Sequence, residues 1–446
     1  MSSKESKFKA GMYLLETLTA GMYNEPLSIY REYIQNAVDS FDMVRQVKRP
    51  GPQFIKIDLD PFESYISIRD NAFGIPSGNA EKTLSRIGAS EKTKGKFRGF
   101  RGIGRLGGLA FCDKATFKTK AAGEDVESVQ EWDCKKLRSL LADTEQQEMT
   151  LRELFDETTA FYQSNSKKKQ GSYFKVKLID VSSFRNNILD ISQIEKYLQS
   201  IAPLPFDPEE FEYTNDIKNY LSIKIPNFVE MKIKLNGKQI FKPYKNNIKS
   251  TNKRVDTITG IKFFDINTEE GMIASGWYGD RKNLIGAINR GEGISGIRVR
   301  DGNIMIGDEH ILDGCFREVR FNGYVFGEIH INSSKLIPNS RRDDFIDNQT
   351  KTEFYNMVDR DIGLPLSKEI RLRSRLKSQI QPTKKNQLEN VQPGDQIKMA
   401  ERCNGENKVT KEESDIKSSA EIILAEIFEK CGKYKKVREI KKKYGY

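Results

Sequence analysis

The sequence predicts an α/β protein: a two-layer α/β sandwich, then a second, middle-type α/β domain and a flexible basic C-terminal segment. Three observations support this prediction. An amphipathic helix lies near the N-terminus, short alternating strands follow it without long helical crossovers, and a polar stretch begins after residue 372. Helices followed by a meandering set of strands fit a two-layer sandwich better than a parallel sheet of βαβ units.

The expected elements follow from periodicity. Residues 11–47 are expected to be helical, and apolar residues at spacings of three and four give residues 26–47 an inward face. In the first domain, alternation predicts strands at 54–59, 65–69, 114–120 and 173–178, a helix at 81–87 and helical patterns within 125–168. Later strands are expected at 261–264, 272–276, 296–300 and 324–331, before a helix at 351–370.

A chain of 446 residues is long for one core and indicates two to three domains. The predicted divisions are a first domain at 1–182, a second at 183–372, a polar linker at 373–418, and a short helix with a basic tail at 419–446. The linker is predicted because few apolar residues occur there.

Composition restricts the function classes. The 31% of charged residues and the absence of an 18-residue apolar run indicate a soluble, cytoplasmic protein without a membrane partner. Five scattered cysteines without a C-x-x-C pair argue against a zinc site or a disulfide framework. Two histidines leave little room for histidine-based catalysis. The net charge of +11 fits either an ordinary basic protein or one with an acidic partner such as nucleic acid.

Three polar residues lie on one stripe of the first long helix, at spacings of four and three: Glu32, Asn36 and Asp39. Asn36 offers the kind of hard oxygen that Mg²⁺ prefers, and Glu32 could take a proton from an attacking water. Asp39 could support these ligands through water. The alternative is a helix whose polar side simply faces solvent.

Asp70 ends a predicted strand and precedes Gly74. A carboxylate at this position can accept the exocyclic amine of adenine, and glycine lets the backbone approach the base closely. The alternative is an ordinary Asp-Asn turn at the end of a strand.

A glycine-rich, basic stretch follows at residues 95–108, where freed backbone amides can hold phosphate. Gly102, Gly104 and Gly107 fit G-x-G-x-x-G by letter. They do not follow the first strand of a βαβ unit, and no G-K-[ST] is present, so neither a dinucleotide fold nor a P-loop is indicated. A generic loop remains the alternative. Together, the three signals describe a pocket for ATP and magnesium.

In this order the motifs resemble the GHKL ATPase superfamily, whose ATP-binding domain has the Bergerat fold. Residues 30–39 resemble its first motif, residues 69–75 its D-x-G-x-G motif with Ala72 at the first glycine, and residues 87–92 and 99–108 its ATP lid. Gly171-Ser172 resembles the Gly-Thr motif that closes the pocket. The resemblance covers about residues 1–180 and is closest to the chaperone and MORC branch.

The resemblance implies roles for these residues. Glu32 would be the general base, Asn36 the magnesium ligand, and Asp70 the residue that reads adenine. The remaining implied nucleotide-binding residues are Asp39, Gly74, Ser90, Lys92, Gly102, Gly104, Gly107 and Ser172.

Residues 255–372 resemble, more weakly, the middle domain of the ninety-kilodalton heat-shock chaperones. The stretch 337–343 looks like the loop that carries an arginine to the γ-phosphate, where it would stabilise the transition state. Arg341 is the preferred match and Arg342 the alternative, and a plain surface pair of basic residues is also open.

The resemblance implies ATP-driven lid closure and homodimerisation, and several functions compete for this cycle. We expect a magnesium-dependent ATPase acting as a chaperone-like switch. The alternatives are a MORC- or MutL-like clamp on nucleic acid, using the basic surface and the tail after Lys430, and a switch that binds ATP without hydrolysis. The partner could be a protein client, nucleic acid or a product of the same operon.

Overall fold

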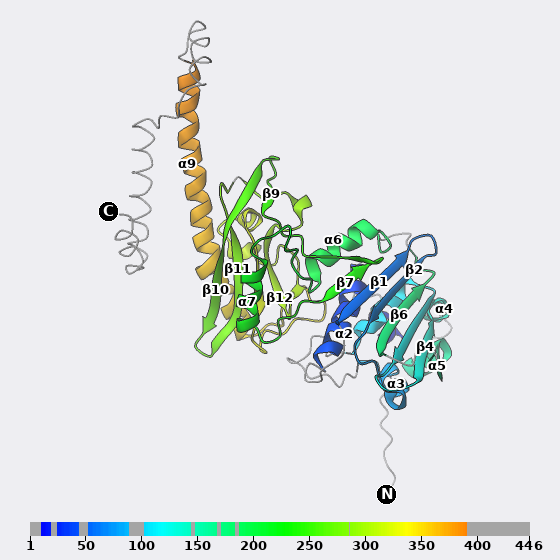
Figure 1. The fold of residues 1–446 in the computed structure, drawn as a ribbon. Helices are drawn as coiled ribbons and strands as arrows, with labels where there is room; N and C mark the ends of the chain where they lie inside the picture. Colours follow the sequence, from blue (N-terminus) through cyan, green and yellow to red (C-terminus); the bar gives the residue numbers. More distant parts are fainter. Residues whose placement is uncertain are drawn as a thin grey trace. The chain divides into compact units, whose positions relative to one another are not determined.

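The computed structural model describes residues 10–18, 25–43, 52–88, 102–143, 148–166, 171–182, 187–284 and 286–389 (Figure 1). It is a mixed α/β protein with two sheets, which confirms the predicted fold class. The chain separates into two compact units, Met1–Arg373 and Ser374–Tyr446, and both sheets belong to the first unit.

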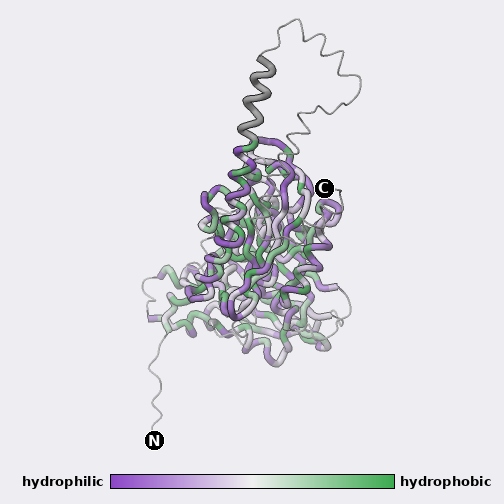
Figure 2. Tube along the Cα trace, turned by 90° about the vertical axis from the view of Figure 1, so that its left-hand side faces the viewer, coloured by the Kyte–Doolittle hydropathy of each residue, from purple (hydrophilic) through white to green (hydrophobic). Residues whose placement is uncertain are grey.

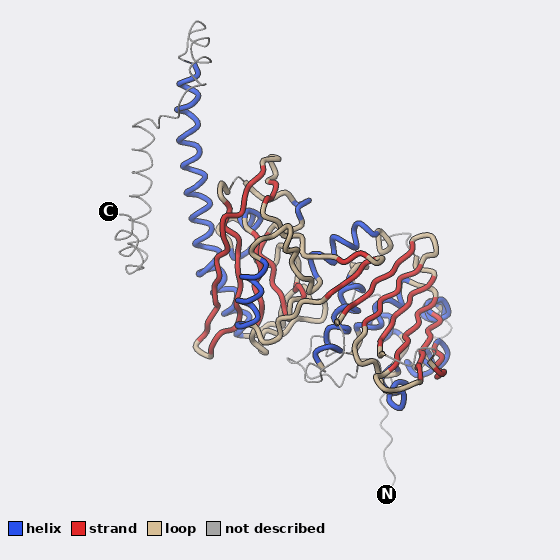
Figure 3. Tube along the Cα trace, in the orientation of Figure 1, coloured by secondary structure: helices blue, strands red, loops and turns tan. Residues whose placement is uncertain are grey.

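The first sheet has eight strands. In spatial order they are β5 (Thr159–Asn165), β4 (Val126–Asp133), β3 (Lys114–Lys120), β6 (Tyr173–Ile179), β2 (Tyr65–Asp70), β1 (Phe54–Asp60), β7 (Lys232–Leu235) and β8 (Lys238–Gln239). All neighbours pair antiparallel except β1 and β7, which are parallel. Strands β1, β2, β6 and β4 can be followed in Figures 1 and 3.

Helices cover one face of this sheet. They are α1 (Tyr13–Glu16), α2 (Ser28–Asp42), α3 (Ser77–Leu84), the 3₁₀ helix η2 (Gly104–Phe111), α4 (Cys134–Ala142), α5 (Leu151–Thr158) and α6 (Ile191–Ile201). Tyr30, Ile34 and Val38 of α2 share a core with Ile57 and Ile68 of the sheet. Figure 2 shows hydrophobic and hydrophilic residues interspersed along the chain, and along β1 buried residues alternate with more exposed ones, as a half-buried sheet requires.

Several of the described helices begin at a residue whose side chain caps them, among them α4, α5 and α6. Thr150 and Glu153 form a reciprocal capping box at the start of α5, and Asp133 and Asp190 accept backbone N–H groups at the starts of α4 and α6. The prediction of helical patterns within 125–168 is confirmed by α4 and α5, and the same range also holds the strands β4 and β5. Short-range periodicity does not reveal the pairing of β4 with β5, and on the helix-covered side Trp132 of β4 packs edge-on against Phe155 of α5.

The first core also takes residues from beyond position 182. Strands β7 and β8 extend the first sheet, and Ile194, Leu198 and Ile233 join its core. A division at residue 182 therefore does not separate the two sheets, because the chain returns to the edge strand β1 after α6 and α7 (Thr214–Lys224).

The second sheet has six strands. Their order is β13 (Ile304–Ile306), β12 (Gly296–Asp301), β14 (Phe326–Ile331), β11 (Gly271–Arg281), β10 (Val255–Thr268) and β9 (Asn247–Lys249). Helix α8 (Gln349–Val358), the π-helical turn η7 (Asp359–Gly363) and the start of α9 (Leu364–Glu389) pack on it through Phe354, Val358 and Ile362. Helix α9 continues into the range predicted as a linker, whereas residues 390–446, with the predicted terminal helix and basic tail, lie outside the described residues.

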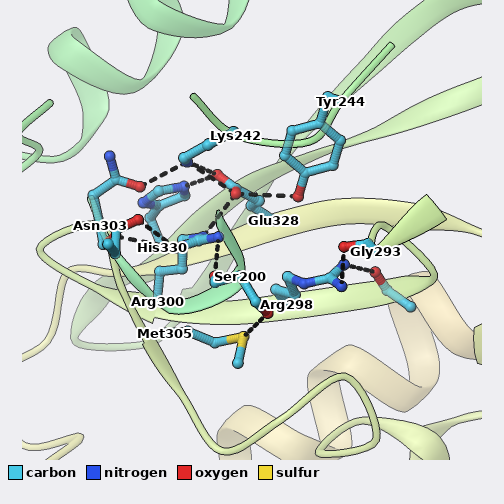
Figure 4. A network of polar contacts seen from close by, with 12 residues as sticks. Ser200, Lys242, Tyr244, Gly293, Arg298, Arg300, Asn303, Met305, Glu328 and His330 are labelled. Carbon is cyan, nitrogen blue, oxygen red and sulfur yellow. Dashed lines mark hydrogen bonds and ion pairs between the residues drawn. The ribbon is translucent and has the colours of Figure 1, made fainter. Parts of the chain in front are cut away.

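A buried network of charges joins the second sheet to the end of α6 (Figure 4). Glu328 accepts from Lys242 at 2.7 Å and pairs with Arg300 at 2.7 Å, and the Arg300 guanidinium donates to the carbonyl of Ser200 at 2.8 Å. Burial alone would raise the pKa of Glu328, but the Arg300 and Lys242 charges hold it well below its usual range. Burial lowers the pKa of His330 to about 4, against the opposing effect of Glu328. The network therefore keeps a charged group satisfied inside the protein.

No helix among the described residues is long and apolar enough to cross a membrane.

Candidate functional site

Helix α2 places the three predicted polar residues at the first core. Glu32 is 8% exposed and Asp39 is fully buried, whereas Asn36 is partly exposed. A helix face that only met solvent would leave both carboxylates in water, so the burial does not fit that alternative. Carboxylates buried in this way need polar partners inside the protein.

The glycine-rich segment packs directly against α2. A Cβ atom placed on Gly104 would lie 2.2 Å from Oε2 of Glu32, so any side chain at this position would displace the carboxylate. The next residue of α2, Tyr33, also contacts this segment. Its hydroxyl donates to the carbonyl of Arg105 at 3.1 Å, and a Cβ on Gly108 would lie 2.2 Å from that hydroxyl. Gly107 is buried within η2, and Gly102 lies just before it with a φ of 72°.

Asp70 ends β2 on the face of the sheet that α2 covers, since it follows the buried Ile66 and Ile68 at period two. It is 4% exposed, and its Oδ1 accepts from the backbone N–H of Ala72 at 2.8 Å. The Ser172 hydroxyl donates to the carbonyl of the same Ala72 at 2.6 Å. The structure thus brings the two predicted motifs together from positions 100 residues apart in the chain.

Gly74 completes this turn. Its φ is 69°, and a Cβ there would lie 2.0 Å from the carbonyl oxygen of Lys120, so no other residue fits without a shift of the backbone. Next to it, the backbone N–H of Ile75 donates to the Thr119 hydroxyl at 2.8 Å, which itself donates to the carbonyl of Tyr173. The turn after Asp70 is held on both sides by the sheet.

The arginine loop reaches α2. Nε of Arg342 lies 3.6 Å from Oε1 of Glu32, and the Arg31 guanidinium donates to the carbonyl of Arg341 at 3.0 Å. Arg342 is 5% exposed, whereas Arg341 is exposed. Of the two arginines, Arg342 is the one whose side chain meets the predicted general base.

Backbone geometry fixes Arg342 in this position. Its φ is 59°, a left-handed conformation that is costly for a residue with a side chain. The carbonyl of Arg342 accepts from Gly307 at 2.7 Å, and the bridge between Pro338 and Phe345 closes the loop. Burial lowers the pKa of Arg342, and the Glu32 carboxylate opposes that shift.

Two groups of residues result. Glu32, Gly104 and Arg342 form one, and Asp70, Gly74 and Ser172 form the other. Both lie on the helix-covered side of the eight-stranded sheet. The predicted lid residues Ser90 and Lys92 lie outside the described residues.

Sequence reasoning missed two contributors. Thr119 occupies a core-facing strand position after Ala115 and Phe117, and a hydroxyl in such a run is a signal that could have been noticed. Arg31 gave no signal, because its contact with the arginine loop spans 310 residues of sequence.

The residues present fit a nucleotide with magnesium. Among the described residues, no group of three or more His, Cys, Asp and Glu side chains could hold a metal ion by itself. Magnesium at triphosphates needs only one or two protein ligands, because phosphates and water supply the rest, and a single ligand such as Asn36 suits that mode. Because Gly104 has no side chain, the surface beside the Glu32 carboxylate is formed by backbone.

The chain has limited sequence similarity to known proteins. No family model matches the chain. It is 27% identical over 130 residues to the chaperone protein HtpG of Acinetobacter baylyi. That stretch covers 25% of this chain, and the chain spans about a fifth of the length of this curated relative. The similarity supports a distant relation to the GHKL chaperones over a quarter of the chain.

Proposed function

We propose that this protein binds ATP with magnesium and hydrolyses it. The observation that carries the proposal is the meeting of Arg342 with the buried Glu32, beside a glycine whose backbone contacts the same carboxylate. A buried acid next to a backbone surface and an arginine suits the transfer of a phosphoryl group to water.

Each group has a defined task. Asp70, held by the N–H of Ala72, accepts the amine of adenine, and Gly74 lets the backbone lie against the base. Glu32 accepts the proton of the attacking water. Asn36 would supply an oxygen ligand to Mg²⁺, and the ion would contribute positive charge that offsets the charge of the phosphates. Asp39 and Ser172 hold these groups in place.

We assign the transition-state arginine to Arg342. Its guanidinium is buried and lies at the general base, so it acts where charge develops and where water screens it least. In the protein without nucleotide, the same guanidinium pairs with Glu32. Binding of the γ-phosphate would draw it toward the transferred group.

The proposed cycle is a chaperone-like conformational switch in the cytoplasm. Lid closure over ATP would bring two chains together, and hydrolysis would release them. The similarity to a chaperone supports this reading. Two contacts could carry the change into the second sheet: the Arg31 contact with the arginine loop, and the Arg300 contact with the end of α6. A protein client or an operon partner would then act on the second sheet.

Phosphate release from the purified full chain tests the proposal. The wild type should hydrolyse ATP only with Mg²⁺. Glu32→Gln should bind a fluorescent ATP analogue with unchanged affinity but release almost no phosphate. Sedimentation of Glu32→Gln with ATP should show a dimer that is absent without nucleotide. Equal hydrolysis by both proteins would refute the assignment of Glu32. If the wild type binds ATP but does not hydrolyse it, the proposed hydrolysis is wrong and the protein is a switch that only binds ATP.

A further inference from the structure

Five basic residues face one another directly across five adjacent strands of the first sheet. Lys118 of β3 pairs in register with Lys175 of β6, which pairs with Arg69 of β2. Arg69 pairs with Lys56 of β1, and Lys56 pairs with Lys234 of β7. We call these five residues the cationic row.

The row lies on the face opposite the candidate site. Its members alternate with core residues, such as Ile55 and Ile57 around Lys56 and Ile233 and Leu235 around Lys234. The Lys56 and Lys118 side chains are 48% and 36% exposed, and the other three are partly exposed. The row is therefore accessible on the side of the sheet away from α2.

Like charges directly opposite each other destabilise a sheet. Two members of the row are partly neutralised, because Lys56 pairs with Asp58 at 3.0 Å and Lys118 with Glu127 at 2.6 Å. Arg69 and Lys175 form no salt bridge with a described residue. Arg69 lies 4.5 Å from the centroid of the Tyr173 ring instead. Burial and the charges of Lys177 and Arg69 lower the pKa of Lys175, as expected for an uncompensated cluster.

We propose that the cationic row binds the phosphate backbone of nucleic acid. Strands lie about 4.8 Å apart, so five members span about 19 Å. That length corresponds to five or six nucleotide steps in one strand of a duplex, which rise about 3.4 Å each. The flexible lysine stems can adjust to phosphates over this range. The phosphates would then offset the repulsion between the five cations, which otherwise lowers the stability of the sheet.

The aromatic residues beside the row indicate which part of the nucleic acid is contacted. Arg69 covers the ring of Tyr173, and Lys177 lies 5.2 Å from the ring centroid of Tyr65. Rings covered by the protein's own cations do not offer free faces for base stacking. Binding therefore runs through phosphates and is independent of sequence. A regular array of cations also matches a backbone of fixed charge spacing better than an acidic protein segment.

This inference does not depend on ATP hydrolysis. Asp70 and Arg69 are neighbours in β2 but point to opposite faces, so the two sites can be changed separately.

Fluorescence anisotropy with a labelled 20-base-pair duplex and a single-stranded oligonucleotide of equal length tests the proposal over a series of salt concentrations. The wild-type slope of log affinity against log salt should be about −4.5 for the duplex if all five cations are engaged. Lys175→Gln combined with Lys234→Gln should weaken binding about tenfold and make the slope shallower by about 2.

The matched control is Lys249→Gln combined with Lys282→Gln, which removes the same charge from exposed lysines outside the row. It should leave affinity within about twofold of the wild type, since distant charges are screened. Tighter binding of the duplex or of the single strand identifies which form the row takes, and either supports the proposal. Equal losses in both double variants, or no binding at low salt, would overturn it.

Discussion

The two faces of the eight-stranded sheet use charge in opposite ways. On the helix-covered face, the carboxylates of Glu32 and Asp70 are buried. Glu32 meets Arg342 from a distant part of the chain, whereas Asp70 accepts from the backbone N–H of Ala72 in its own turn. On the open face, five cations stand side by side with few partners. The first face therefore carries buried charges that are paired, and the second carries a row of like charges.

The difference arises within single strands. Consecutive residues of a strand point to opposite faces, so Asp70 lies on the helix-covered face while Arg69 lies in the cationic row. A shift of one residue in β2 would exchange them. The same register therefore defines both proposed sites, and each can be changed without the other.

The largest expected effect concerns the general base. Glu32→Gln keeps the size of the side chain but removes the proton acceptor, so hydrolysis should fall about 10²- to 10⁴-fold. ATP affinity should stay within about threefold, as measured by titration with a fluorescent analogue. Loss of binding together with turnover would mean that Glu32 holds the nucleotide rather than the water.

The next prediction distinguishes the roles of the two neighbouring arginines, Arg341 and Arg342, in ATP turnover. Arg342→Ala should reduce turnover about 10²- to 10³-fold, because it removes a buried cation from the reacting group. Arg341→Ala should have little effect, since only its backbone carbonyl contacts α2. Steady-state phosphate release measures both, with thermal unfolding as a check that each variant is folded. A larger loss in Arg341→Ala would reverse the assignment.

A second pair of variants compares the two faces directly. Asp70→Asn should lower ATP affinity about 100-fold, because an amide cannot replace a charged acceptor at the adenine amine. Asp58→Asn, on the open face of β1, should leave ATP affinity unchanged. Isothermal titration of both proteins measures this. Equal affinities would place adenine away from the end of β2.

The smallest effect concerns stability. Lys175→Gln should stabilise the fold by about 0.2–1 kcal/mol, since it removes a cation opposed by Arg69 and Lys118. The folded-state pKa of Lys175 lies below its usual value, so the unfolded chain binds more protons in the alkaline range below about 10.5. Wild-type stability should therefore rise with pH through that range, and the variant should lose this rise. Urea unfolding at several pH values measures it, and a destabilised variant would contradict the account.

Much of the fold could be predicted from sequence. The spacing of Tyr30, Ile34 and Val38 predicts α2, and alternation predicts the positions of β1, β2, β3 and β6 within about one residue. The order of the motifs then predicts a pocket between α2 and the end of β2. These are local patterns, which a single sequence carries well.

Other features depend on long-range pairing. The partner of Glu32 is fixed by a left-handed residue in a loop some 310 positions away, so sequence alone left Arg341 and Arg342 open. The cationic row exists only through the register of five strands, two of them far apart in the chain. No window of sequence shows that Lys234 lies beside Lys56.

One experiment tests the two-face account most directly. ATP affinity and duplex-DNA affinity would be measured on the same three proteins: the wild type, Asp70→Asn, and Lys175→Gln combined with Lys234→Gln. The account predicts that Asp70→Asn loses ATP but keeps DNA, and that the double lysine variant loses DNA but keeps ATP. If either variant lost both ligands, or if the wild type bound neither, the assignment of separate sites to the two faces would be wrong.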